Sequence, residues 1–491
     1  MNRRMIFYTV GRIAIVESAL MLLPALVSLI YLEKSGFSFL ITAAFALVLG
    51  LFLTRFKPKD TLIYAKESFS IVAYTWLLMS AIGALPFVIS GAIPSYIDAF
   101  FETVSGFTTT GASILTDVEA LDKGLLFWRS FTHWIGGMGV LVLVTAVVSN
   151  IGDRSINILK AEMPGPTVGK LLPRSRDTAK VLYIIYIVLT FIQIILLRVG
   201  GMSMFESVVH AIGTAGTGGF GIKADSIASY SPYLQWVITV FMILFSINFN
   251  LYYLLLLRKF KPVFKSDELR FFAGLVFCCI TIITINITPI YSSVSDALRH
   301  SAFQVASIVS TSGFATADFN QWPGLSKAIL MLLMAVGACA GSTGGGLKVT
   351  RVVILIKSIG RELQKLLHPR SVKTVSTEGK KLDDTTLNGV NSYFSIYIIC
   401  IVVIYILLSF EPFDMETNFT AALSCFNNIG PGLAGVGPAS SYAAYSGFSK
   451  ILLSFAMLLG RLEIFPLLLG LNPFIWKSKR NKVFKFNKTN K

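Results

Sequence analysis

Residues 213–221, "GTAGTGGFG", contain a G-x-G-x-x-G pattern made by Gly216, Gly218 and Gly221. Glycines at this spacing let a backbone approach a pyrophosphate, which is the chemistry of dinucleotide-binding enzymes. That chemistry also needs a strand before the glycines, a helix that opens on them and an acidic residue about 20 positions later. Here a short apolar segment precedes the pattern and the polar stretch "IKADSIASYSP" follows it. A nucleotide-using enzyme is therefore only the distant alternative.

The same stretch has three relatives along the chain, which suggests a different chemistry. "SGFTTTGAS" (105–113), "SIVSTSGFA" (307–315) and "SCFNNIGPG" (424–432) align with it without gaps. The four share a glycine at the seventh place: Gly111, Gly219, Gly313 and Gly430. Glycine accepts φ > 0 and lets backbones crowd together. Four such turns on one axis would form a ring of backbone carbonyls, the arrangement that replaces a cation's hydration shell in potassium filters.

Long apolar segments surround these stretches and must position them. The chain of 491 residues is 54% hydrophobic and 14% charged, whereas soluble proteins carry about 25% charged residues. Crossing the hydrocarbon core of a bilayer takes about 20 apolar residues. Segments that reach or approach this length include 11–32, 37–53, 67–94, 127–149, 181–197, 234–257 and 390–410. The pattern predicts an all-α polytopic membrane protein, with 11–32 as its first span and not as a cleaved signal peptide.

The spans and the glycine stretches form a repeated unit. Each stretch follows a long span and a segment too short to cross a bilayer, and it precedes a second long span. The unit is therefore helix, half-helix, pore loop, helix. With the two N-terminal spans it predicts ten transmembrane helices around a pseudo-fourfold central pore. The expected regions are an N-terminal two-span region (1–60), pore repeats 1 and 2 (61–178, 179–265), pore repeat 3 with an intramembrane glycine-rich loop (266–385), pore repeat 4 (386–476) and a basic cytoplasmic tail (477–491).

The formal net charge of +17 is concentrated between the spans. Lys and Arg gather in cytoplasmic loops of membrane proteins, where they also contact anionic lipid. The distribution predicts a multi-pass protein of the cell inner membrane with cytoplasmic N- and C-termini, a lipid partner and no nucleic acid. The basic segments are 1–4, 55–60, 151–180, 258–265, 360–381 and the tail.

Other reactive side chains do not form a catalytic or metal-binding pattern. The five cysteines lie in apolar surroundings without a C-x-x-C, and the four histidines lack metal-ligand spacing. Four acids near the starts of the half-helices suit the positive end of a helix dipole, or else a vestibule that attracts cations. These acids are Asp98, Glu206, Asp296 and Asp414.

Two features within spans bear on gating. "GACAGSTGGGLK" (337–348) interrupts a span and falls short of a phosphate-binding loop, because Leu347 precedes the lysine and Val349 replaces the required hydroxyl. It is read as a hinge or re-entrant loop. Arg461 is a charge inside the last span, and Glu463 is a poor partner for it on a helix. Arg461 therefore either faces a lumen as an electrostatic barrier or bonds backbone carbonyls.

The four stretches together with "WIGGMG" (134–139), "AEMPGPTVGKLLPRSRDTAK" (161–180), "AGSTGGGLK" (340–348) and "GRLEIFP" (460–466) resemble the TrkH family. Its members are potassium-translocating subunits of bacterial Trk systems, within the Trk/Ktr/HKT superfamily. The resemblance covers nearly the whole chain and includes the two extra N-terminal spans. It implies channel-like potassium uptake through a selectivity filter, without a covalently bound cofactor and with K+ as the transported ion. The alternative is a carrier that couples K+ to Na+ or H+ by symport. The implied partners are a second copy in a homodimer and a cytosolic nucleotide-binding regulator of the TrkA type.

The resemblance also implies which residues act. In this family the ion is held by carbonyls that lead into each glycine, and those glycines favour K+ over Na+. Each of the four glycine stretches forms one quarter of the filter, numbered in chain order. The second quarter (213–221) departs from the family pattern, with Gly213 and Gly216 where serine is common, which implies a softer filter there. The implied filter residues are Thr109, Thr110, Gly111, Thr217, Gly218, Gly219, Thr311, Ser312, Gly313, Asn428, Ile429 and Gly430. The implied closed gate is loop 339–347 with Arg461, its residues being Gly341, Gly344, Gly345, Gly346, Lys348 and Arg461.

Overall fold

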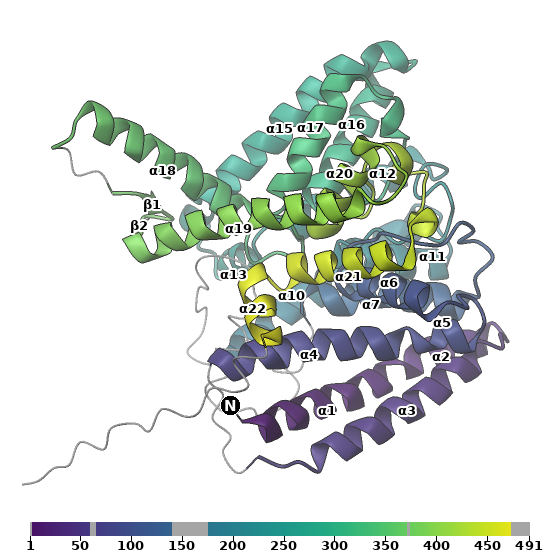
Figure 1. Ribbon diagram of the computed structural model, residues 1–491. Helices are drawn as coiled ribbons and strands as arrows, with labels where there is room; N and C mark the ends of the chain where they lie inside the picture. The colour runs from purple at the N-terminus through teal and green to yellow at the C-terminus, as the bar shows by residue number, and fades with distance from the viewer. Residues whose placement is uncertain (1, 59–64, 140–174, 371–373, 473–491) are drawn as a thin grey trace, which may run out of the picture.

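A computed structural model describes residues 2–58, 65–139, 175–370 and 374–472 (Figure 1). The basic tail, most of segment 151–180 and the motif residues 161–174 lie outside this part of the chain. The described residues form helices joined by loops, with one hairpin of two short antiparallel strands, β1 (Ser376–Thr377) and β2 (Lys380–Lys381). The all-α character expected from the sequence is confirmed for these residues.

The N-terminal helices lie side by side at the bottom of Figure 1. They are α1 (Arg3–Leu20), α2 (Leu22–Ile30), α3 (Gly36–Thr54), α4 (Ala65–Gly83) and α5 (Leu85–Ile89). Helices α1 and α3 cross where Gly11 faces Gly50, since a Cβ atom on either glycine would run into the carbonyl oxygen of the other. Small residues at a crossing allow the close approach on which helix packing in lipid depends.

Four short helices occupy the segments too short to cross a bilayer: α6 (Tyr96–Phe107), α11 (Met204–Gly216), α16 (Val294–Val309) and α20 (Met415–Phe426). Each begins with a capping side chain that accepts a hydrogen bond from the backbone N–H three residues later. These caps are Ser95, Ser203, Ser293 and Asp414. Such caps satisfy amide groups that the first helical turn leaves unpaired.

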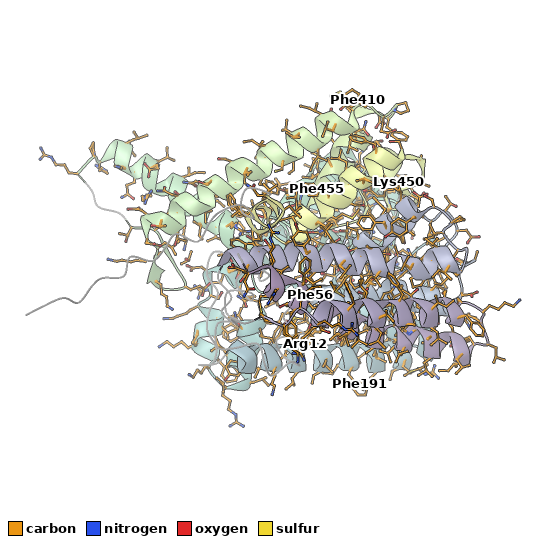
Figure 2. All side chains as sticks on the ribbon, turned by 60° about the horizontal axis from the view of Figure 1, so that its bottom comes forward. Arg12, Phe56, Phe191, Phe410, Lys450 and Phe455 are labelled. Atoms are coloured by element: carbon orange, nitrogen blue, oxygen red, sulfur yellow. The ribbon has the colours of Figure 1, made fainter. Side chains whose placement is uncertain are left out.

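The four acids near these helix starts take the helix-terminal role that the sequence left open. Asp414 is itself a cap, and Glu206 completes a capping box by accepting from the N–H of Ser203. Asp296 accepts from the hydroxyl of Ser293 at 2.7 Å. Asp98 lies 2.6 Å from the ammonium of Lys450, which Figure 2 labels, on α21 (Gly447–Arg461). All four therefore stabilise the positive ends of short helices.

The longer helices have the length and apolar character of membrane spans. Six candidate spans among the described residues are both long enough and apolar enough: 3–30 (α1 with α2), 36–54, 67–89, 180–199, 267–290 and 384–408. They include α10 (Ser175–Val199), α15 (Asp267–Ile287, continued by a 3-10 turn at Thr288–Ile290) and α19 (Asp384–Leu408). Phe191 of α10 and Phe410, just after α19, point out from opposite edges of the molecule (Figure 2). The result is an outer surface suited to lipid.

Two expected spans are broken. Helix α12 (Pro232–Ser246) meets α13 (Phe249–Leu256) at 91°, so the run 234–257 is not one straight helix. Helix α21 likewise meets α22 (Ile464–Leu471) at 119°. Counted as single spans, these pairs bring the number of candidate spans to as many as eight among the described residues. Helix α7 (Lys123–Gly137) lies in the expected span 127–149, of which residues 140–149 are outside the described part.

Shorter helices and turns complete the described part of the chain. These are α14 (Phe260–Phe264), α17 (Gly324–Val336), α18 (Val349–Leu367) and the 3-10 turns Phe319–Gln321, Ala434–Val436 and Tyr442–Ala444. Helix α18 projects away from the body of the molecule beside β1 and β2 (Figure 1).

Candidate functional site

The four short helices end in the same way, and their ends carry the glycine stretches. In each, one residue is left-handed: Thr109, Thr217, Thr311 and Asn428 have φ between 55° and 61°. Its N–H bonds the carbonyl three residues back at 3.0–3.3 Å, and the next N–H bonds the carbonyl five residues back at 2.8–3.0 Å. This is the Schellman motif, which normally places glycine at the left-handed position. A β-branched threonine is strained at the left-handed position. The same strain occurs in three of the four turns, and such strain marks a functional site.

The shared glycine follows two residues after each left-handed residue and is itself at positive φ, between 75° and 97°. A Cβ atom on Gly111 would overlap the carbonyl oxygen of Gly218, and one on Gly219 would overlap that of Ser312. In the same way Gly313 faces the carbonyl of Ile429, and Gly430 faces that of Thr110. Each quarter thus contacts the next and the fourth contacts the first, so the four turns form a closed ring.

The predicted filter residues are therefore brought together, and several of their side chains hydrogen-bond within the turns or to neighbouring backbone. The amide of Asn428 donates to Oγ1 of Thr110 at 3.0 Å and to the carbonyl of Met457 at 2.9 Å. The hydroxyl of Thr217 donates to the carbonyl of Gly216 at 2.6 Å. These hydrogen bonds hold the side chains of the turns in place.

The four glycines also line one cavity of about 350 Å³, which opens at the mouth of the ring. Arg129 of α7 borders this cavity and lies 2.8 Å from the carboxylate of Glu102 in α6, with both side chains almost fully buried. Glu102 also accepts from Ser113 at 3.0 Å and from the N–H of Ile114 at 3.0 Å. The pair anchors the segment after Gly111, a role that no spacing in the sequence indicates.

The glycine-rich loop contacts the ring from the side of the helix ends. It leaves α17 and folds back, so that the N–H of Lys348 bonds the carbonyl of Val336 at 3.1 Å. The N–H of Gly345 donates to Oγ1 of Thr311 at 2.6 Å. A Cβ on Gly344 would press on the carbonyl of Ser310, and one on Gly345 would press on that of Asn427. Glycine is needed here because the loop packs directly on the filter turns.

The loop is held in place from two sides. The break between α12 and α13 leaves backbone groups free, and the loop pairs them: Cys339 donates to the carbonyl of Ser246 at 3.1 Å, and Phe249 donates to that of Gly341 at 3.0 Å. The ammonium of Lys348 donates to the carbonyl of Gly344 within the loop. Irregular backbone at membrane depth is tolerated where it is paired in this way.

Arg461 connects this loop to α7. Its guanidinium donates to the carbonyl of Thr343 at 2.7 Å, to that of Gly137 at 2.6 Å and to that of Gly136. Arg461 therefore bonds backbone carbonyls, an arrangement that leaves its role as an electrostatic barrier open to test. Glu463, whose φ is 64°, forms an ion pair with Arg351 of α18 at 2.5 Å.

The nucleotide-binding reading of residues 213–221 is excluded by the local structure. Helix α11 precedes the pattern and ends at Gly216. A dinucleotide site needs a helix that opens on the glycines and presents its positive end to phosphate. Here the glycines follow a helix C-terminus, which repels a phosphate and favours a cation.

Comparison with known proteins gives consistent matches. Residues 35–478 match the TrkH family, described as cation transport proteins. The chain is 36% identical to the Trk system potassium uptake protein TrkH of Escherichia coli over 97% of its own length and 100% of that protein. It is 35% identical to the Trk system potassium uptake protein TrkG of the same organism, covering 97% and 99%. The crystal structure of the potassium transporter TrkH from Vibrio parahaemolyticus matches with a TM-score of 0.87 at 33% identity, covering 97% of this chain and 100% of that one.

Proposed function

The chain belongs to the TrkH family of cation transport proteins, and on that basis we propose that it takes up potassium through the ring of filter turns. It is an integral protein of the inner membrane and a transporter, not an enzyme. The observation that carries the proposal is the closure of the ring. Each filter glycine faces the carbonyl that precedes the glycine of the next quarter, around all four quarters.

The chemistry of the ring suits a cation. The carbonyls of Thr110, Gly218, Ser312 and Ile429 belong to the ring itself. Carbonyl oxygens at fixed positions replace the hydration shell of K+. Four helix C-termini directed at the same place add a partial negative charge of about half a unit each. The Schellman bonds hold the turns, so the ring cannot easily shrink around the smaller Na+.

We further propose that loop 339–347 and Arg461 form the closed gate. The loop packs against Thr311 and the helix-end carbonyls of Ser310 and Asn427. Arg461 ties its Thr343 to α7. Conduction then requires the loop to leave these contacts, so the gate residues are Arg461, Gly341, Gly344, Gly345, Gly346 and Lys348.

The wider architecture follows as part of the same proposal. It comprises ten spans, two at the N-terminus and eight in four repeats, with the region boundaries given above. It also includes cytoplasmic termini, a homodimer, contact with lipid and a TrkA-type regulator on the basic cytoplasmic face. We propose channel-like permeation, with a carrier that couples K+ to Na+ or H+ as the alternative.

Flux measurements on the purified protein in liposomes test the proposal. We expect K+ flux that scales with the electrochemical gradient and exceeds Na+ flux. Saturating K+ flux that requires a Na+ or H+ gradient would instead identify a coupled carrier. Absence of K+ flux with an intact protein would refute potassium transport.

A further inference from the structure

His133 lies in α7, one turn before the helix ends, and its imidazole is fully buried. Nδ1 is 2.7 Å from the carbonyl oxygen of Gly106 in α6. Because a carbonyl oxygen only accepts hydrogen bonds, Nδ1 carries the ring hydrogen. Nε2 has no hydrogen-bond partner among the residues that the structure describes. The ring is therefore fixed on one side by a hydrogen bond and elsewhere by packing.

The packing is against the second filter turn. A Cβ atom on Gly218 would fall inside the imidazole, closest to Cγ, Nδ1 and Cδ2. A Cβ on Gly216 would overlap the backbone carbonyl of His133. The ring of Phe220 lies 4.3 Å from the imidazole between centroids. His133 thus contacts the turn just before and just after its shared glycine.

The first and third quarters show what the imidazole replaces, while the fourth has Asn427 and Ile429 at the matching positions. In the first, the hydroxyls of Thr108 and Thr110 hydrogen-bond each other at 2.8 Å across the left-handed residue. In the third, the hydroxyls of Ser310 and Ser312 do the same at 2.7 Å. The matching residues of the second quarter are Gly216 and Gly218, which have no side chains to form such a brace.

We propose that His133 is the positioning residue of the second quarter and determines K+ selectivity there. Its imidazole fills the space of the missing hydroxyl brace and holds the Gly218 carbonyl, the one that faces Gly111. Glycines lose the most conformational freedom on ordering. The turn therefore relaxes when the imidazole is removed and a cavity remains in its place. The inference rests on the proposed potassium filter, and it opposes the expectation of a softer second quarter, because the imidazole of His133 supports that turn.

Reciprocal substitution tests this, because a Cβ on Gly218 meets the imidazole, whereas a Cβ on Gly216 meets only the backbone carbonyl and the Cβ of His133, both of which alanine keeps. In full-length protein in liposomes, Gly218→Ser should lower K+ flux about tenfold or more, because the serine side chain overpacks against the imidazole of His133. His133→Ala/Gly218→Ser should recover most of that flux. The matched control is Gly216→Ser, which meets the His133 backbone carbonyl, so His133→Ala should not rescue it. A double variant as inactive as Gly218→Ser would overturn the inference.

Selectivity gives a second readout that a merely structural role would not move. His133→Ala should lower the K+/Na+ flux ratio about tenfold, since a cavity replaces the support of the turn. His133→Asn keeps a donor for Gly106 and loses volume, so it should lie between His133→Ala and the wild type. An unchanged ratio in His133→Ala would contradict the inference.

Two further measurements separate failure of the inference from failure of the proposed function. The thermal midpoint of each purified variant, in K+ and in Na+, reports folding and ion binding without transport. The wild type should be stabilised more by K+ than by Na+, and His133→Ala should lose most of that difference. A wild type without K+ flux would refute the proposed function. If the wild type transports K+ and is stabilised more by K+ than by Na+, and His133→Ala keeps that full difference, only the role of His133 is refuted.

Discussion

The backbone N–H of Gly345 donates a 2.6 Å hydrogen bond to Oγ1 of Thr311, which joins the glycine-rich loop directly to a left-handed residue of the filter. Loop and filter therefore cannot move independently. A loop that leaves its place must break this bond, and a filter turn that changes shape must disturb the loop.

Thr311→Val removes this acceptor while keeping the shape and branching of the side chain. The buried N–H of Gly345 is then unpaired in the closed state, at a cost of about 1–3 kcal/mol. If the loop closes the pore, basal K+ flux in liposomes should rise several-fold. Thr217→Val is the matched control, because the Thr217 hydroxyl bonds its neighbour Gly216 and not the loop. Equal effects of the two substitutions would count against coupling between loop and filter.

Arg461→Ala should raise basal K+ flux by about tenfold, because it removes a charge-assisted bridge worth about 1.5–3 kcal/mol between the Thr343 carbonyl and α7. Arg461→Lys keeps the charge but gathers its donors on one nitrogen atom, so it loses the guanidinium fork that reaches carbonyls on two sides. If bridging closes the gate, the lysine variant should leak almost as much as the alanine variant. A tight lysine variant would favour an electrostatic barrier, and unchanged conduction in both would remove Arg461 from the gate.

Glu102→Gln and Arg129→Gln should each destabilise the protein by about 3–5 kcal/mol, because each leaves a buried charge without its partner. Their effects on conduction should differ in kind: an unpaired Arg129 cation beside the mouth repels K+. The double variant should recover stability relative to either single variant. Thermal midpoints and K+ flux check this, and additive losses in the double variant would contradict it.

Asp414→Ala should lower stability by about 1 kcal/mol at neutral pH, since it removes the cap of α20. Hydrogen bonds from the side chain and backbone of Thr417 lower the pKa of Asp414. Because this pKa is lowered, the charged cap stabilises the folded protein at pH values above the ordinary pKa of aspartate. The stabilisation is lost as the pH falls through the lowered pKa. The difference in thermal midpoint between variant and wild type should therefore shrink on acidification. A difference that grows would contradict this assignment.

The sequence was sufficient for the parts of the fold that local pattern determines. The four shared glycines, the short helices before them and the loop at 337–348 all occur where the spacing and hydropathy predicted. The same patterns missed the break at Ile247–Asn248, because the apolar run 234–257 continues through it. That bend is paired by the distant Cys339 and Gly341, which no local pattern reveals.

The functional site was likewise predictable only in part. Glycine spacing predicted the turns, yet their order around the ring depends on contacts between quarters. His133, Glu102 and Arg129 were missed as contributors because single side chains in apolar helices carry no motif. The one available signal was the glycines of the second quarter, Gly213 and Gly216 among them, which do not show what packs against the turn.

The most direct test of the filter is the K+/Na+ flux ratio of Gly219→Ser compared with Gly91→Ser in liposomes. Gly219 has φ of 75° and Gly91 has φ of 77°, so serine is strained equally at both positions. Only Gly219 faces a carbonyl of the next quarter, whereas a Cβ on Gly91 has no neighbour within 4 Å. We predict that Gly219→Ser loses K+ preference and most flux while Gly91→Ser keeps both. Wild-type selectivity and flux in Gly219→Ser would contradict the assignment of these turns as the filter.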